Sequence, residues 1–159
     1  MKINSTRFGE IEISENDIID FEEGILGFEE MKKYVILNIE ENNPLMIMQS
    51  IEEPALAFIL INPYEFRSEY QLKLSDNEVK KLKIEKEEDV DLFAIVVVPH
   101  ENPEKMTANL QGPIVINRNK KLGKQVINNN HQYGIKHCII KEMEAMSGGA
   151  KNADTDKKA

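Results

Sequence analysis

A single stretch decides the fold, Thr107-Ala108-Asn109-Leu110-Gln111-Gly112-Pro113-Ile114-Val115-Ile116-Asn117. It joins a polar, turn-prone opening directly to an apolar run that is typical of a buried strand. No acidic or nucleophilic cluster accompanies it. The pattern therefore favours a surface that holds a shape and is recognised over a pocket that performs chemistry.

Short runs rich in Ile, Val, Tyr and Phe recur along the chain, separated by turn-forming residues. They predict strands at 11–13, 18–21, 34–39, 45–49, 55–61, 70–74, 92–99, 113–117, 125–128 and 135–140. The run 92–98 does not alternate, so it is predicted as a central strand that is covered on both faces. Many short strands at close spacing predict an all-β fold, mainly antiparallel, in a small barrel-like or sandwich domain.

Helical signals are few. Ser75-Asp76-Asn77-Glu78 has the capping-box pattern that starts a helix, and a second short helical turn is predicted at 29–32. From Ser147 onward the sequence has no large apolar side chain that could compensate by burial for the entropy lost on ordering. We therefore predict one domain over residues 1–144 and a flexible C-terminal tail over 145–159.

The composition limits the classes of protein to which this chain can belong. The chain has 159 residues, of which 41% are apolar and 30% charged, and no apolar run approaches the ~18 residues of a membrane span. The start, Met1-Lys2-Ile3-Asn4-Ser5, lacks the apolar region of a signal peptide. The lone Cys138 cannot form an internal disulfide, which fits a reducing compartment. These features predict a cytoplasmic protein.

Charge is unevenly distributed. Residues 1–70 carry 15 acidic and 5 basic side chains, whereas residues 71–140 carry 9 acidic and 11 basic ones. Between Lys105 and Lys136 there is no acidic residue. Such a first half can attract basic proteins and repel nucleic acid; the alternative is an ordinary solvated surface. The basic stretch contains only Tyr133 as an aromatic residue, which disfavours RNA binding.

The sequence has no residue pattern that is typical of a metal site or a catalytic site. His131, His137 and Cys138 lie within eight residues, but adjacent residues of a strand at 135–140 point to opposite faces, so His137 and Cys138 cannot share an ion or form a nucleophile and base pair. Cys138 is therefore predicted to be buried and structural, with no cofactor or metal. Adjacent acidic pairs in turns do not supply the two facing carboxylates of glycoside chemistry. A Gly24-Ile25-Leu26-Gly27 turn lacks the lysine of a phosphate loop.

Polar residues at strand ends remain as candidates for binding. The turn from Phe21 to Phe28 brackets two glycines with two phenylalanines, and a strand ends in Gln49 and Ser50. Thr107, Asn109 and Gln111 form a third group. The alternative for each is that the side chain satisfies loop backbone groups, as Asn and Thr commonly do.

Taken together, these segments resemble the flagellar assembly factor FliW family over about residues 1–140. The resemblance is carried by 21–28, Met48-Gln49-Ser50, the run 92–98, the Thr-Ala-Asn-Leu-Gln-Gly-Pro-Ile block from Thr107, and Gly123-Lys124-Gln125. Two departures are visible. Leu26 stands where the family usually has a proline, and Lys136-His137 where an arginine-histidine pair is common.

The resemblance implies a small barrel-like all-β protein without catalytic activity. It implies a cytoplasmic regulator that binds the RNA-binding translational repressor CsrA and also binds flagellin, so that flagellin level controls flagellin translation by partner switching. Neither direct nucleic-acid binding nor membrane binding is expected. Antagonism of CsrA could act by imitating RNA or, as the resemblance favours, allosterically from another edge of CsrA.

Nine residues are predicted to contact partners: Phe28, Gln49, Ser50, Phe58, Thr107, Asn109, Gln111, Asn117 and Gln125. The rival function is a small-ligand-binding or carboxylate-based hydrolytic β-barrel that uses Glu22, Glu23, Glu52 or Glu53. It predicts a deep pocket holding a carboxyl group of raised pKa. A purely structural adaptor, which would bind flagellin but not CsrA, is the third alternative.

Overall fold

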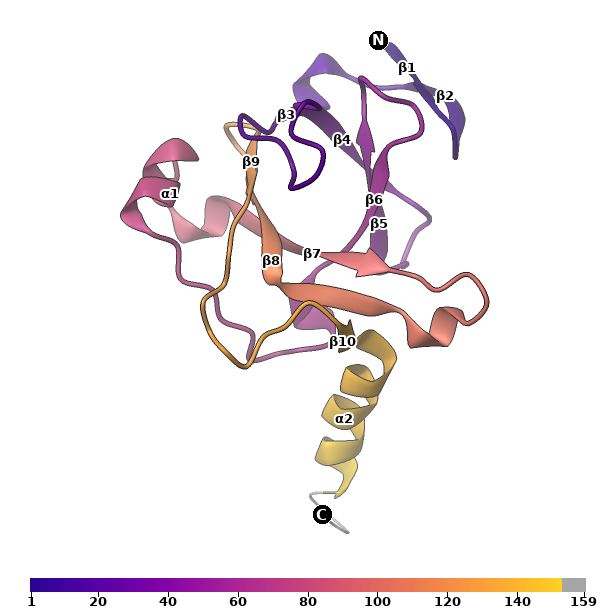
Figure 1. Cartoon of the computed structure of the whole chain (residues 1–159), viewed down its shortest axis with the longest axis vertical. Helices are drawn as coiled ribbons and strands as arrows, with labels where there is room; N and C mark the ends of the chain where they lie inside the picture. The colour runs from indigo at the N-terminus through magenta and orange to yellow at the C-terminus, as the bar shows by residue number, and fades with distance from the viewer. Residues whose placement is uncertain (153–159) are drawn as a thin grey trace.

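Seven strands close into a ring within residues 1–152, the part of the chain that the computed structural model describes (Figure 1). Around the ring they are β3 (Ile19–Asp20), β4 (Lys33–Asn38), β5 (Leu45–Ser50), β6 (Ala57–Ile61), β7 (Val90–Val97), β8 (Thr107–Asn117) and β9 (Leu122–Gln125). Neighbours are antiparallel except β3 and β9, which pair in parallel at Asp20 and Leu122. The predicted all-β, mainly antiparallel barrel is confirmed.

The interior of the barrel is filled by side chains that alternate along the strands. Phe21, Tyr34, Met48, Leu60 and Ile114 are 0% exposed and belong to one cluster. Phe21 and Tyr34 meet edge to face, with ring centroids 5.3 Å apart. The barrel is therefore a packed core and not a pore.

Both faces of β7 are covered, as predicted for the run 92–98. Phe93 and Ile95 belong to the interior cluster, whereas Ala94 and Val96 belong to a second cluster that also contains Tyr133. Val97, at the end of the strand, is 64% exposed. A non-alternating apolar sequence thus corresponds to a strand buried from two sides over most of its length.

Three layers cover the outside of the ring. The hairpin of β1 (Lys2–Ser5) and β2 (Gly9–Glu12) packs on β4 through Ile3, Ile13 and Val35. Helix α1 (Asp76–Lys81) is followed by Leu82, which packs on Val115 of β8. The third layer includes the aromatic residues Phe66, Tyr70 and Tyr133. Short 3-10 turns occupy Glu15–Asp17, Pro63–Glu65, Glu87–Asp89 and Pro103–Lys105.

Strand β8 is longer than the sequence indicated. Residues 107–112, expected as a polar turn, belong to the same strand as 113–117. The polar character instead marks an irregularity, because Phe93 of β7 pairs with Ile114 while Ile95 pairs with Asn109. A bulge of this kind bends a strand and raises its twist. Gly112 lies within it.

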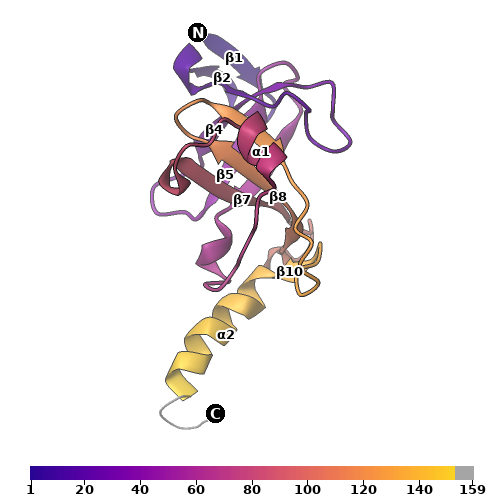
Figure 2. The same ribbon diagram turned by 90° about the vertical axis from the view of Figure 1, so that its left-hand side faces the viewer.

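The helix predictions were partly right. The capping box of α1 is confirmed, since Glu78 N donates to Ser75 Oγ at 3.1 Å and Ser75 N to Glu78 Oε1 at 2.9 Å. The helical turn predicted at 29–32 is wrong, because Glu29 and Glu30 form a turn that leads into β4. Helix α2 (Ile139–Asn152) was not predicted, and it projects away from the barrel (Figure 2).

The C-terminal region departs most from expectation. The strand predicted at 135–140 shrinks to β10 (His137–Cys138), paired with the start of β8, because the chain turns into α2 at Ile139. Cys138 is half-buried rather than buried. Residues 145–152, predicted as the start of a flexible tail, continue α2. Residues 153–159 of that predicted tail lie outside the described part of the chain.

Candidate functional site

Phe28 and Phe58 lie together at one end of the barrel. Their rings meet edge to face with centroids 5.4 Å apart, and the Phe58 ring lies 6.0 Å from that of Tyr34. Phe28 is 45% exposed. It therefore joins the interior core to the surface, as expected for an aromatic anchor of an interface.

The turn that presents Phe28 depends on backbone geometry. Gly24 has φ +69° and Gly27 has φ +90°, values that side-chain-bearing residues rarely adopt. Phe28 N donates to Ile25 O at 2.7 Å and closes the turn. Leu26, at its tip, is 77% exposed.

A shallow slot of about 600 Å³ lies beside this turn, and we call it the 28–56 slot. Its apolar side chains include Phe28, Met31 and Leu56. Glu29, Glu30 and Glu53 also line it. The slot thus combines apolar and acidic side chains, which suits a basic partner that offers an apolar side chain.

Gln125 ties this turn to the opening of β8. Its Oε1 accepts from Leu26 N at 3.1 Å, and its Nε2 donates to Gly112 O at 3.0 Å. Asn109 Oδ1 accepts from Gln111 N and Gly112 N at 3.0 and 2.9 Å. Leu26 supplies the N–H for the contact with Gln125, and a proline at the same position would lack it.

Five of the nine predicted residues are therefore connected by these contacts, namely Phe28, Phe58, Asn109, Gln111 and Gln125. Gln111 is exposed, and the Asn109 and Gln125 side chains are half-buried. Thr107 is also half-buried, where β8 pairs with both β7 and β10. The sequence did not single out Met31 and Leu56 of the slot, although both lie close in sequence to predicted residues.

Gln49 and Ser50 are 0% exposed and are used internally. Gln49 Oε1 accepts from Ser5 Oγ at 2.8 Å, and its Nε2 donates to Pro54 O and Leu56 O at 3.1 Å each. Ser50 Oγ accepts from two amide groups of the turn that follows. Both side chains stabilise the 50–57 turn, and neither is accessible to a partner in this structure.

Asn117 is likewise enclosed, at 2% exposure, and lies away from the slot. Its Nδ2 donates to Leu82 O at 2.9 Å and Lys83 O at 3.0 Å, and its Oδ1 accepts from Asn119 N and Lys120 N. The side chain fastens the end of α1 to the β8–β9 turn.

Three of the four carboxylates named by the rival function, those of Glu23, Glu52 and Glu53, form hydrogen bonds or ion pairs within the surface structure. Glu52 Oε1 accepts from Lys32 N and Lys33 N at 2.7 and 3.0 Å, and Glu53 Oε2 from Ala55 N at 3.2 Å. All four glutamates are exposed. Glu23 has a pKa lowered to about 2 by hydrogen bonds first from Lys124 and then from Lys81. This shift is opposite in direction to the raised carboxyl pKa that the rival function requires.

Glu23 is expected to stabilise the fold in a pH-dependent way. Lys124 Nζ and Lys81 Nζ lie 2.7 and 2.8 Å from its carboxylate, so it links the 21–28 turn to β9 and α1. Because its pKa falls from 4.5 to about 2 on folding, the stabilisation is present above about pH 4.5 and is lost as pH falls toward 2. The carboxylate is half-exposed, so Glu23→Gln should lower the free energy of unfolding by only about 1 kcal/mol at pH 7.

Urea unfolding at a series of pH values measures the contribution of the Glu23 carboxylate to stability. The difference between Glu23→Gln and the parent should vanish near pH 2 and shrink in high salt. Glu22→Gln is the matched control, because that side chain makes no hydrogen bond or ion pair within residues 1–152. An equal loss in the two variants would contradict the assignment.

The metal candidates are dispersed. His137 Nδ1 lies 2.7 Å from Glu142 Oε2, and its Nε2 accepts from Gly134 N at 2.8 Å, so both ring nitrogens are occupied. His131 is exposed. Among the described residues no group of three or more His, Cys, Asp or Glu side chains could hold a metal ion. In the same part of the chain, none of the helices has the length and apolar character needed to cross a membrane.

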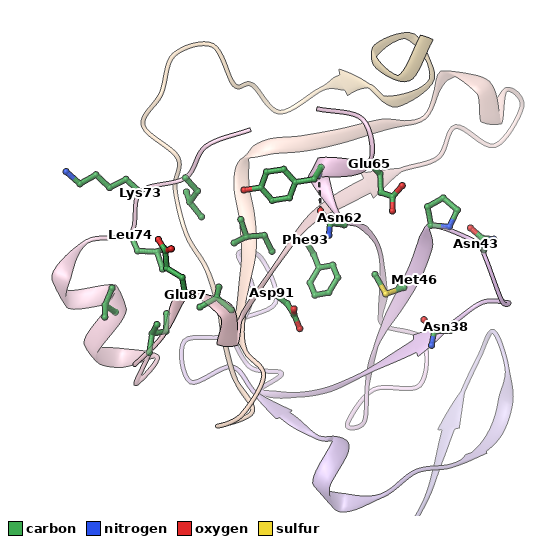
Figure 3. Close-up of a pocket in the computed structure, with 17 residues that line it drawn as sticks. Asn38, Asn43, Met46, Asn62, Glu65, Lys73, Leu74, Glu87, Asp91 and Phe93 are labelled. Atoms are coloured by element: carbon green, nitrogen blue, oxygen red, sulfur yellow. Dashed lines mark hydrogen bonds between the residues drawn. The ribbon is translucent and has the colours of Figure 1, made fainter. Parts of the chain in front are cut away.

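A larger hollow, of about 900 Å³, lies at the other end of the barrel (Figure 3). Tyr34 of β4 pairs with Ser50 at the end nearer the slot, whereas Asn38 pairs with Met46 at the far end, beside this hollow. Phe93 lies between Leu74 on one side and Met46 on the other (Figure 3). We call it the α1 groove, because Val79 of α1 and Ile84, which follows the helix, line it.

Comparison with known proteins places these features in context. The family model described as FliW protein matches residues 2–139. The flagellar assembly factor FliW of Syntrophus aciditrophicus (strain SB) is 46% identical over 149 residues, covering 94% of each chain. That of Geobacillus sp. (strain WCH70) is 47% identical over 145 residues, covering 91% of this chain and 99% of the relative. A crystal structure of the flagellar assembly factor FliW superimposes with a TM-score of 0.80 at 46% identity, covering 87% of this chain and 96% of the other.

Proposed function

This chain belongs to the FliW family of flagellar assembly factors, and from that premise we propose that it binds and antagonises the translational repressor CsrA and also binds flagellin. Flagellin and CsrA then compete for it, so rising flagellin returns CsrA to its repressive state. Family membership is the observation that carries the proposal. The protein acts in the cytoplasm by binding alone, without a catalytic step or a direct contact to nucleic acid.

The surface around the 28–56 slot supports a role in partner binding. It combines the exposed Phe28 and Leu26 with the carboxylates of Glu29, Glu30 and Glu53. An RNA-binding repressor carries basic surface, and acidic residues around an apolar anchor complement such a partner. We assign the CsrA contact to this slot.

Antagonism is proposed to be allosteric. The protein grips CsrA away from the RNA site, and its negative field disfavours RNA. Direct imitation of RNA is the second candidate, favoured by the excess of 15 acidic over 5 basic residues in the first 70. Titration of CsrA with this protein in saturating RNA separates them, because a ternary complex supports the allosteric mode and complete loss of binding supports mimicry.

The decisive experiment is a set of calorimetric titrations of this protein with CsrA, with flagellin, and with CsrA in the presence of flagellin. Saturable binding to each partner and displacement of CsrA by flagellin are expected. Binding of flagellin alone would support the structural adaptor instead. Binding of neither partner would overturn the proposal.

Phe28→Ala should weaken CsrA binding by about 2 kcal/mol, or roughly 30-fold, because it removes an exposed aromatic anchor. The measurement is the same titration, with thermal unfolding to verify that the variant is folded. Phe8→Ala is the matched control, since Phe8 is 40% exposed on the β1–β2 hairpin outside the slot. Equal affinities of the Phe28 and Phe8 variants would exclude the slot as the contact.

A further inference from the structure

Residues 71–75, the 71–75 segment, have the character of a strand without belonging to one. Leu72 and Leu74 are half-buried and pack beside Leu82 and Val115, while Gln71, Lys73 and Ser75 are exposed. This two-residue alternation is that of an extended chain. The sequence predicted a strand at 70–74. That prediction is wrong, because no other strand pairs with these residues.

The main chain of the segment is unpaired. Within residues 1–152, no hydrogen bond is made by the N–H or C=O groups of Leu72, Lys73 or Leu74. Gln71, in contrast, is held on one side: its N donates to Tyr133 Oη at 3.2 Å and its O accepts from Asn128 Nδ2 at 2.8 Å. The segment is an open edge with one end fixed.

The direction of the free groups follows from this attachment. In an extended chain, the main-chain groups of successive residues point to opposite sides. Lys73 therefore shares the side of Gln71, which faces the segment around Asn128. The N–H and C=O groups of Leu72 and Leu74 therefore point to the side away from that segment, and both residues line the α1 groove. Two donors and two acceptors, spaced two residues apart, are thus free on one side of the segment, as they are along the open edge of a strand.

The groove is lined by apolar side chains, which we call its floor, and by charged side chains, which we call its rim. Met46, Leu92 and Phe93 belong to the floor, and Glu65, Glu87, Asp91 and the basic Lys73 belong to the rim. Asp91 is paired with Arg118 at 3.1 Å, whereas no ion pair is made by Glu65 or Glu87 inside the described region. The adjacent residues 85–91 carry five acidic side chains and one basic one. A ligand that fits this rim is positively charged.

We propose that the 71–75 segment is a docking edge to which an extended, basic peptide segment of a partner protein adds as a strand. The peptide pairs with Leu72 and Leu74, places apolar side chains at alternate positions on the groove floor, and directs Lys or Arg side chains to Glu65 and Glu87. The proposal goes beyond the function above, because the groove and the 28–56 slot lie at opposite ends of β4 and β5. The proposal does not depend on which partner binds to the 28–56 slot.

The test uses a blocked hexapeptide of alternating lysine and valine, titrated into the full chain and followed by NMR. Saturable binding with slowed hydrogen exchange at the amides of Leu72 and Leu74, but not at Lys73, is expected. Two further peptides carry N-methyl groups on the lysine or on the valine amides. One of them should lose affinity at least tenfold and the other should not, because only every second peptide amide faces the edge.

Charge variants complete the test. The double variant Glu65→Gln, Glu87→Gln should bind the peptide about tenfold more weakly at low salt, and the matched pair Glu29→Gln, Glu30→Gln in the 28–56 slot should not change it. The proposal is overturned if the methylated peptides bind equally, if the slot pair weakens binding instead, or if no binding occurs at millimolar peptide. CsrA titrations with the same two double variants show separately whether the proposed function stands.

Discussion

The Gly123→Val protein is expected to lose at least about 3 kcal/mol of unfolding free energy, the upper range for overpacking a core. A Cβ at Gly123 would lie 2.7 Å from Cε1 and Cε2 of Phe21. Phe21 is 0% exposed and packed edge to face on Tyr34, so its ring has no room to withdraw. Urea denaturation, with a fall of about 6–12 °C in Tm, provides the measurement.

Gly134→Ala is the matched control for Gly123. A Cβ at Gly134 would meet nothing within 4 Å, so the change should alter stability by no more than about 0.5 kcal/mol. If both variants unfold at the same urea concentration, close packing of β9 on the Phe21 ring is not the reason that position 123 needs a glycine.

Gly24→Ala is expected to cost about 3 kcal/mol by two separate effects. Gly24 has φ +69°, which costs a side-chain-bearing residue about 1 kcal/mol. Its Cβ would also lie 2.6 Å from Glu29 Cα and 2.7 Å from Glu29 O, and backbone atoms cannot rotate away. Because the same turn presents Phe28, the proposed binding to CsrA should weaken together with stability.

Gly27→Ala separates the two effects. Gly27 has φ +90° but a Cβ there would meet nothing within 4 Å, so only the conformational cost of about 1 kcal/mol is expected. The difference between the two alanine variants in urea denaturation measures the contact with Glu29. Equal losses would show that the contact is relieved by a small shift of the turn.

Much of the fold could be predicted because local pattern and burial agree. The run 92–98 is apolar at every position, and β7 is covered by the interior cluster on one face and by the Tyr133 cluster on the other. The capping box at Ser75 and Glu78 is purely local and was found where the sequence indicated. Residues 70–74 have the alternation of a strand, but pairing depends on whether another strand lies alongside, which local sequence does not encode.

The site could be predicted only in part, because a polar residue at a strand end can face inward or outward. Gln49 and Gln125 look alike in sequence, yet Gln49 is fully buried on main-chain carbonyl groups while Gln125 is half-buried and bridges two surface segments. The difference arises from the tight 50–57 turn, whose carbonyl groups need a donor. Phe28 is 45% exposed, whereas Phe21 at the other end of the same segment is fully buried; the contact of Phe28 with a partner stays a prediction.

The pairing of β3 with β9 has a consequence for synthesis of the chain. The ring closes between Asp20 and Leu122, and the Glu23–Lys124 ion pair beside it joins residues 101 positions apart. A contact so distant in sequence forms only after the loop between its partners has been ordered. On the ribosome, the β4–β5–β6 meander can therefore assemble early. One edge of β3 stays unpaired until β9 has left the exit tunnel.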